Sequence, residues 1–209
     1  MKLPRIYPIL DTASLQARAV PLEMAAAAFL EGGAAILQIR HKAHWSRAVF
    51  ESAKVVARLC REAGASLVVN DRADFALLLE AGLHIGQDDL PPRDARRLMG
   101  PEAAIGFSSH GSRQLCAAGG EPVDYVAMGP IFATASKRNP DPVVGVEELR
   151  RSRPLIEKPL VAIGGITLEN AGEVLRAGAD SVAVIADLLP EQPTARSLRE
   201  RMEAWRRAV

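Results

Sequence analysis

The chain has 209 residues, of which 48% are hydrophobic and 24% charged, and its 26 basic and 25 acidic side chains leave a formal net charge of +1. This composition is typical of a globular protein and excludes a largely disordered chain. The near-neutral balance lacks the basic surface of a nucleic-acid binder or of a protein held on anionic lipid, so we expect neither partner. No signal-peptide-like stretch begins the chain and no apolar run reaches the ~18 residues of a membrane span, which favours a cytoplasmic protein.

Eight short apolar runs alternate with longer stretches of helical periodicity. The runs cover residues 6–10, 35–39, 66–69, 83–85, 104–107, 123–128, 160–163 and 181–185. Each is too short for a stable helix, and most are rich in Val, Ile and Leu, which is typical of buried parallel strands. Between the runs, as in residues 45–63, apolar residues recur near every 3.6 positions and predict helices. Cys60 and Cys116 both fall in helical stretches, where we expect buried thiols.

A glycine-containing junction closes several predicted helices before the next strand. It occurs at residues 31–34, 62–65, 80–82 and 176–179. We expect its glycine to take the left-handed conformation that ends a helix. The chain therefore consists of a βα unit repeated about eight times, at roughly 26 residues per unit.

Eight βα units predict an α/β protein folded as a single (β/α)₈ TIM barrel over residues 1–209. A doubly wound open sheet is the competing architecture. That fold would carry a glycine-rich phosphate loop after its first strand, whereas residues 11–14 contain no glycine. The barrel is therefore favoured.

Polar residues follow the predicted strands, where the active site of such a barrel lies. Members of this set with chemically useful side chains are Gln38, Arg40, Lys42, Asn70, Asp71, Asp89, Ser108, His110, Thr134, Ser136 and Lys137. Gln38, Arg40 and Lys42 alternate, so a strand would point all three to one face. His84 lies inside a short run, and we expect it to line the barrel. Two roles are equally compatible with His110: it could orient a phosphate, or it could cap the next helix.

Asp71 and Asp89 end neighbouring predicted strands, so their carboxylates can share one hard cation. Mg²⁺ is typically held by one or two carboxylates together with substrate phosphate oxygens. Each residue has an alternative: Asp71 could cap the helix that starts near Ala73, and Asp89 could form a turn before Leu90. The pair together favours a Mg²⁺ site.

Two anion sites follow from the remaining residues. Arg40 and Lys137 could neutralise a diphosphate held with the metal, although a solvated lysine is an equal alternative for Lys137 in its proline-flanked loop. Gly164, Gly165 and the start of the last helix offer backbone N–H groups after the seventh and eighth strands, the usual phosphate site of a barrel. No nucleophilic serine or cysteine lies beside a histidine base.

Six segments at the predicted strand ends match one family in order. They are residues 37–42 (LQIRHK), 69–74 (VNDRAD), 84–91 (HIGQDDLP), 106–110 (GFSSH), 129–137 (GPIFATASK) and 161–166 (VAIGGI). With them the chain resembles the thiamine-phosphate synthases, of the superfamily shared with thiazole tautomerases, over about residues 7–188. Each segment alone is modest evidence, but six in order at strand ends are specific.

The resemblance implies a Mg²⁺-dependent transferase that joins 4-amino-2-methyl-5-pyrimidinylmethyl diphosphate to 4-methyl-5-(2-phosphooxyethyl)thiazole, giving thiamine phosphate and diphosphate. It implies that the pyrimidine diphosphate is bound by Gln38, Arg40, Lys42, Asn70, Ser108 and Lys137. Of these it gives catalytic roles to Arg40, Ser108 and Lys137. It gives Mg²⁺ binding to Asp71 and Asp89, and contacts with the thiazole phosphate to Thr134, Ser136, Gly165, Ile185 and Ala186. The C–O bond of the pyrimidine would break first, so that no covalent nucleophile is needed.

The chain departs from the family pattern at four places. His41 stands where an acid is usual, and the stretch before Leu83 is one residue short, which could change how Asp89 approaches the metal. Ser136 replaces a usual threonine, and Ala186 stands where a serine is common. None of these changes removes the carboxylate pair or the cations.

Three rival functions share the scaffold. A thiazole tautomerase would use a histidine at the end of the sixth strand, where this chain has Pro130. A phosphosugar isomerase or aldolase-like barrel would need an acid–base or Schiff-base group near the phosphate site, and no lysine lies inside a predicted strand. A barrel that binds thiamine phosphates without catalysis would not need both aspartates and Lys137. The sequence is compatible with a monomer and with a homo-oligomer.

Overall fold

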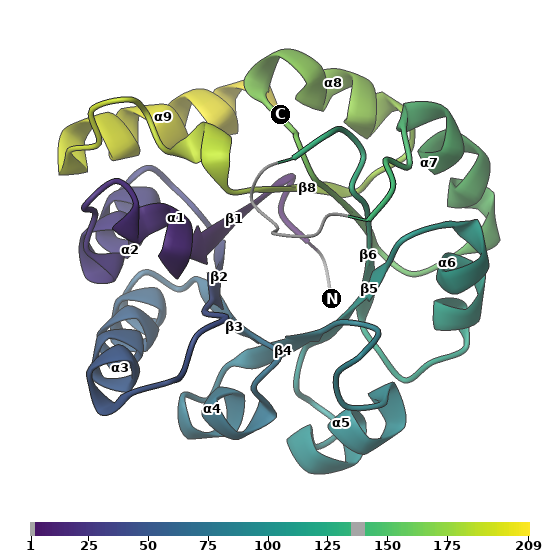
Figure 1. Ribbon diagram of the computed structural model, residues 1–209, viewed down its shortest axis with the longest axis horizontal. Coiled ribbons are helices and arrows are strands. Elements are labelled where there is room, and N and C mark those ends of the chain that lie inside the picture. The colour runs from purple at the N-terminus through teal and green to yellow at the C-terminus, as the bar shows by residue number, and fades with distance from the viewer. Residues whose placement is uncertain (1–2, 135–140) are drawn as a thin grey trace.

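The computed structural model describes residues 3–134 and 141–209, in which eight parallel strands close into a barrel (Figure 1). The strands are β1 (Ile6–Asp11), β2 (Ile36–Arg40), β3 (Ser66–Asn70), β4 (Gly82–Ile85), β5 (Ile105–Ser109), β6 (Tyr125–Met128), β7 (Leu160–Ile163) and β8 (Ser181–Val184). They pair in sequence order, and β8 returns to pair with β1. The predicted (β/α)₈ barrel is confirmed.

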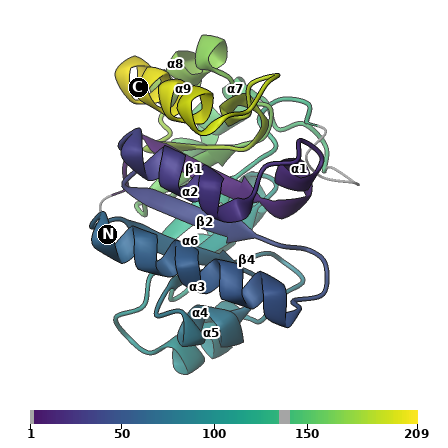
Figure 2. The ribbon, with the colours of Figure 1, turned by 90° about the vertical axis from the view of Figure 1, so that its left-hand side faces the viewer.

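Helices follow the strands and surround the barrel (Figure 1). They are α1 (Thr12–Gln16), α2 (Leu22–Glu31), α3 (Arg47–Glu62), α4 (Ala73–Leu78), α5 (Pro92–Met99), α6 (Ser112–Gly119), α7 (Val146–Ser152), α8 (Leu168–Arg176) and α9 (Ala195–Ala208), with 3₁₀ turns η1 (Arg153–Leu155) and η2 (Ala186–Leu188). Figure 2 shows α2 and α3 lying side by side along the outside of the barrel, where they contact each other. Among the described residues, no helix is both long and apolar enough to cross a membrane.

The strands extend one or two residues beyond several of the predicted apolar runs. Asp11, Arg40 and Asn70 are each the last residue of a strand, and β5 runs on through Ser108 and Ser109. Hydrophobic periodicity misses these positions because their side chains are polar. Their backbones nevertheless stay in register, with Asp11 opposite Arg40 and Asn70 opposite His84. The ladder therefore holds the polar side chains in fixed directions at the end of the barrel.

The helix-ending junctions behave as expected at three of the four places. Gly33, Gly64 and Gly178 have φ angles of +92°, +67° and +112°. The exception is the junction after α4, where Glu80 takes the left-handed conformation (φ +53°) and Gly82 is the first residue of β4. The prediction was wrong there because α4 already ends at Leu78, so the left-handed position after the helix falls on Glu80, two residues before Gly82.

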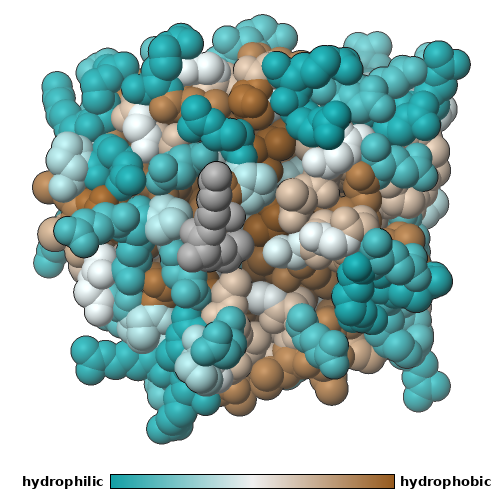
Figure 3. All heavy atoms as spheres, turned by 180° about the vertical axis from the view of Figure 1, so that it is seen from behind, coloured by the Kyte–Doolittle hydropathy of each residue, from teal (hydrophilic) through white to brown (hydrophobic). Residues whose placement is uncertain are grey.

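Apolar side chains fill two layers. The inner layer lies inside the barrel and includes Tyr7, Ile9, Val68 and Tyr125. The outer layer lies between strands and helices and includes Trp205 of α9, which is fully buried. Hydrophobic atoms also show near the centre of the face opposite to that of Figure 1, with hydrophilic atoms around its edge (Figure 3). Of the two thiols, Cys60 is buried as expected.

Cys116 is exposed, which corrects the expectation of a buried thiol. It lies on α6, where Leu115 and Ala118 are the buried residues. Leu115 and Ala118 face the barrel, whereas Cys116 and Ala117 between them are exposed. Apolar context alone therefore did not predict which face of the helix carries the thiol.

Candidate active site

A cavity of about 770 Å³ opens at the carboxyl ends of the strands and receives side chains from all eight of them. The predicted site residues that the structure describes all line it: Gln38, Arg40, Lys42, Asn70, Asp71, Asp89, Ser108, Thr134, Gly165, Ile185 and Ala186. Ser136 and Lys137 lie outside the described residues. Residues from distant parts of the chain meet here because parallel strands of a barrel end at the same rim.

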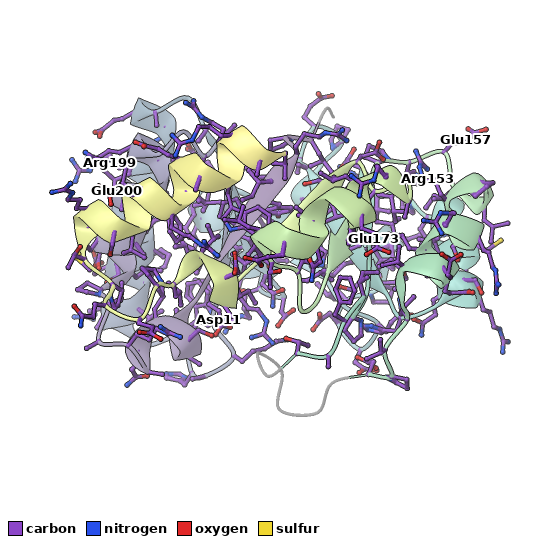
Figure 4. All side chains as sticks on the ribbon, turned by 90° about the horizontal axis from the view of Figure 1, so that it is seen from above. Asp11, Arg153, Glu157, Glu173, Arg199 and Glu200 are labelled. Atoms are coloured by element: carbon purple, nitrogen blue, oxygen red, sulfur yellow. The ribbon has the colours of Figure 1, made fainter. Side chains whose placement is uncertain are left out.

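Arg40 is held at the cavity wall by an ion pair that sequence reasoning missed. Its guanidinium donates to the Asp11 carboxylate at 2.5 Å, and Asp11 is only 3% exposed. The same carboxylate accepts from the N–H and hydroxyl of Ser14 and so caps α1. Asp11 lies at the end of β1 and is labelled in Figure 4. The available signal was an aspartate three residues before a serine at a strand–helix junction, a pattern typical of an N-cap.

Asp71 and Asp89 come together as a carboxylate pair. Asp71 follows β3 in the left-handed region (φ +65°), and its N–H donates to the carbonyl of His84 at 2.8 Å. The ammonium of Lys42 donates to Asp71 Oδ2 at 2.5 Å. Burial raises the pKa of Asp89 above its ordinary value, and contact with the Asp71 carboxylate raises this pKa further. The two acids therefore repel each other when both are ionised.

The alternative roles of these two aspartates have different outcomes. The N-cap of α4 is Arg72, without a side-chain cap, so the capping role considered for Asp71 is wrong. Asp89 does close a turn, because its Oδ2 accepts from the N–H of Gly86 at 2.6 Å. This hydrogen bond occupies one of the two carboxylate oxygens of Asp89.

The carboxylate pair fits a hard divalent cation. Mg²⁺ prefers oxygen donors and is commonly bound by one or two carboxylates with substrate phosphate oxygens. A cation bound between Asp71 and Asp89 would reduce the repulsion between their two negative charges. The Lys42 ammonium already lies against Asp71. The residues present therefore fit the group, and the Mg²⁺ site stays a prediction.

The opposite side of the cavity is built from backbone. Gly165 has a φ of +63°, and a Cβ there would lie 2.5 Å from the carbonyl oxygen of Ala133, so the loop after β6 packs directly on this turn. After β8 the chain enters η2 rather than the last helix, which begins only at Ala195 and corrects the expected helix start. Among the described residues, the N–H groups of Gly165, Ile185 and Ala186 have no hydrogen-bond partner. Such N–H groups beside a cavity suit an anion.

Five polar side chains join in a chain of hydrogen bonds through the barrel interior beneath the cavity. Gln38 Nε2 lies 3.1 Å from Tyr7 Oη, which lies 2.9 Å from Tyr125 Oη. His84 Nδ1 lies 3.0 Å from Tyr125 Oη, and its Nε2 lies 2.9 Å from Ser108 Oγ. Burial lowers the pKa of His84 to about 4 and raises the pKa of Tyr7 to about 12, so both side chains are neutral near pH 7.

This network confirms that His84 lines the barrel, but neither tyrosine was predicted from the sequence. The available signal was their position inside apolar runs on inward-facing strand positions. Asn70 adds a further buried group: its Nδ2 has no hydrogen-bond partner among the described residues. A buried amide of this kind requires an acceptor, which a ligand in the cavity could supply.

His110 also lines the cavity. Its ring Nδ1 bonds the carbonyl of Gly129 at 2.9 Å and lies 3.4 Å from the Asp141 carboxylate. The N-cap of α6 is Gly111, so the helix-capping role considered for His110 is wrong. The ring instead ties the end of β5 to the loop that follows β6.

Comparison with known proteins gives one consistent result. A sequence family described as thiamine monophosphate synthase matches residues 6–188. The thiamine-phosphate synthase of Koribacter versatilis is 48% identical over 90% of this chain and 90% of that protein. The thiamine-phosphate synthase of Moorella thermoacetica is 42% identical over 86% of this chain and 86% of that protein. A thiamine phosphate pyrophosphorylase structure from Pyrococcus furiosus superposes with a TM-score of 0.84 at 31% identity, covering 98% of this chain and 95% of that one.

Proposed function

The chain belongs to the thiamine monophosphate synthase family, whose members are transferases, and we propose that it condenses a pyrimidinylmethyl diphosphate with a thiazole phosphate. The substrates are 4-amino-2-methyl-5-pyrimidinylmethyl diphosphate and 4-methyl-5-(2-phosphooxyethyl)thiazole, and the products are thiamine phosphate and diphosphate. The reaction depends on Mg²⁺. One observation carries the proposal: a carboxylate pair with cations faces, across a single cavity, a set of backbone N–H groups that have no partner in the described part of the chain.

The diphosphate occupies the side of the cavity that carries Arg40, Lys42 and Asn70. The guanidinium of Arg40 is oriented by Asp11, and the buried amide of Asn70, whose Nδ2 has no partner among the described residues, gains an acceptor. Lys137 adds a further positive charge by resemblance to the family, and it lies outside the described residues. When bound, Mg²⁺ supplies positive charge to the departing diphosphate, and Asp71 and Asp89 hold it.

The proposed reaction needs no covalent nucleophile. The bond between the pyrimidine methylene carbon and the diphosphate oxygen breaks first, and the electron pair leaves with the diphosphate. The resulting pyrimidinylmethyl cation is captured by the thiazole nitrogen. Arg40, Lys42 and Ser108 therefore act by stabilising negative charge that grows on the leaving group, which is electrostatic catalysis.

The thiazole phosphate binds on the opposite side. Its phosphate accepts from the N–H groups of Gly165, Ile185 and Ala186, and from the hydroxyl of Thr134. Ser136 adds a second hydroxyl by resemblance, outside the described residues. Anchoring the thiazole by its tail aligns the ring nitrogen with the reactive carbon, and such alignment lowers the barrier of a two-substrate reaction.

The deciding experiment mixes both substrates with Mg²⁺ and the purified protein and measures thiamine phosphate and diphosphate by chromatography. We expect equal amounts of both products, and none when either substrate is omitted or the metal is chelated. Formation of an isomerised thiazole phosphate, with the pyrimidine diphosphate unconsumed, would support the tautomerase reading instead. Binding of thiamine phosphate without turnover would support a non-catalytic barrel.

A further inference from the structure

We infer that the buried network Gln38–Tyr7–Tyr125–His84–Ser108 is a directional hydrogen-bond relay that makes Ser108 a donor toward the cavity. Tyr7, Tyr125 and His84 are then positioning residues that act through Ser108. The two tyrosines of the relay are the only tyrosines in the chain. The relay links β2, β1, β6, β4 and β5.

The direction follows from counting hydrogens. Gln38 Nε2 can only donate, so Tyr7 Oη accepts from it at 3.1 Å. Among the described residues, the phenolic hydrogen of Tyr7 then has one acceptor within reach, Tyr125 Oη at 2.9 Å. Tyr125 accepts this bond and must donate its own hydrogen onward.

The next acceptor is His84 Nδ1, 3.0 Å from Tyr125 Oη. Because Nδ1 accepts, the neutral ring carries its hydrogen on Nε2. That hydrogen is donated to Ser108 Oγ at 2.9 Å. Ser108 Oγ therefore accepts from the protein with one of its lone pairs, and its own hydrogen is not used in this bond.

The hydroxyl hydrogen of Ser108 is consequently left to point into the cavity, which Ser108 lines. The site therefore offers a hydrogen to a ligand atom that accepts, such as a diphosphate oxygen. The identity of that ligand rests on the proposed function, whereas the direction of the relay does not. Gly106 leaves room for the ring of Tyr125, because a Cβ at this position would lie 2.1 Å from Tyr125 Cζ.

The first test measures the His84 tautomer in the ligand-free protein by long-range ¹H–¹⁵N NMR on the ¹⁵N-labelled chain. We expect a pyrrole-type Nε2 and a pyridine-type Nδ1. A pyrrole-type Nδ1 would reverse the relay and overturn the inference. This result does not depend on any substrate, so it stands apart from failure of the proposed function.

The second test titrates inorganic diphosphate with Mg²⁺ into wild type, Tyr125→Phe, Ser108→Ala and the double variant by calorimetry. We expect Tyr125→Phe to weaken binding about three- to tenfold, the usual worth of one hydrogen bond. In the Ser108→Ala background the same change should have almost no further effect, because the donor that it orients is gone. An equal loss in both backgrounds would show that Tyr125 does not act through Ser108 and would overturn the inference.

Discussion

At the scale of single residues, ion pairs fix the positions of the charged side chains in the site. The ammonium of Lys42 faces two carboxylates, Asp71 and Asp89, and burial raises the pKa of Asp89. On the same side of the cavity, the Asp11 carboxylate binds Arg40 and caps the start of α1. Each of these side chains therefore has a role that a single substitution can separate from the rest.

Asp71→Ala removes the carboxylate that is available to a metal without removing a helix cap. We expect turnover to fall at least about 100-fold, because metal-assisted charge stabilisation is lost. Calorimetry should show that Mg²⁺ no longer strengthens binding of the pyrimidine diphosphate, whereas thiazole phosphate binds as in wild type. Binding of the pyrimidine diphosphate to wild type that is unaffected by a chelator would contradict the metal assignment.

Asp11 can be tested with two variants that differ in one respect. Asp11→Asn keeps an oxygen for the cap of α1 but removes the charge that orients Arg40, and Asp11→Ala removes both. We expect both to lower kcat/KM for the pyrimidine diphosphate by about tenfold to 100-fold, as a misplaced group does. Only Asp11→Ala should show the further loss of about 1 kcal/mol that a missing cap costs. Steady-state kinetics and urea unfolding measure the two effects, and unchanged kinetics in both variants would remove Asp11 from the site.

At the scale of elements, the junctions between helices and strands carry both stability and function. The α4–β4 junction closes with Glu80 in the left-handed region, where three others use glycine. The register of β3 with β4 is retained, with Asn70 opposite His84. The shortening before Leu83 that the family resemblance implies therefore leaves the pairing of β3 with β4 intact.

Glu80→Gly should stabilise the fold. A residue with a side chain loses about 1–2 kcal/mol of stability when its backbone is in the left-handed region, and glycine avoids this strain. Part of the gain is offset because glycine has more conformational freedom in the unfolded chain. We expect a net gain of about 0.5–1 kcal/mol in the free energy of unfolding. Glu62→Gly, at the last helical position of α3, is the matched control and should lose up to about 1 kcal/mol. A loss in both variants would show that Glu80 makes a compensating contact.

The turn after β7 offers a second matched pair. Gly165 and Gly64 have similar φ angles, +63° and +67°, but a Cβ at Gly165 meets Ala133 and Phe132, whereas a Cβ at Gly64 has nothing within 4 Å. We expect both alanine variants to lose about 1 kcal/mol of stability from the shared strain, and Gly165→Ala to lose more because its Cβ meets Ala133 and Phe132. Only Gly165→Ala should also weaken thiazole phosphate binding, by about tenfold or more, because its N–H moves. Equal affinities in both variants would exclude Gly165 from the phosphate site.

At the scale of the whole molecule, the barrel is closed around a polar centre. His84 is buried with a pKa of about 4, compared with 6.5 when exposed, so the unfolded chain binds a proton more readily than the folded one between these values. The free energy of unfolding should therefore fall as pH decreases from 6.5 to 4, by about 3 kcal/mol in total. Urea unfolding across this range measures the slope.

The control for this slope is a pair of histidine variants. His84→Gln removes the titrating ring, so its stability should change less than that of wild type between pH 6.5 and 4, even if its overall stability is lower. His44→Gln, at an exposed position, should keep the wild-type slope. A slope that survives in His84→Gln would assign the acid sensitivity to other groups.

The sequence by itself determined the order of elements, the barrel and the rim on which the site lies. Apolar runs of strand length and glycine-closed helices are local patterns, and a barrel maps the carboxyl end of every strand onto one rim. That is why all the described residues of the predicted site line one cavity. Hydrophobic periodicity did not predict the polar residues that end the strands, such as Asp11 and Arg40, because their side chains are not apolar.

Only the tertiary structure decided which polar groups meet. The hydrogen bond between Tyr7 and Tyr125 joins residues 118 apart in sequence, and the Asp11–Arg40 pair joins residues 29 apart. Such pairs depend on strand register and on which side chains point inward, and neither is written in local periodicity. The contact between Asp71 and Asp89 depends on the distance between the ends of two strands. The exposure of Cys116 depends on which face of α6 packs on the barrel, and the left-handed Glu80 depends on where α4 ends.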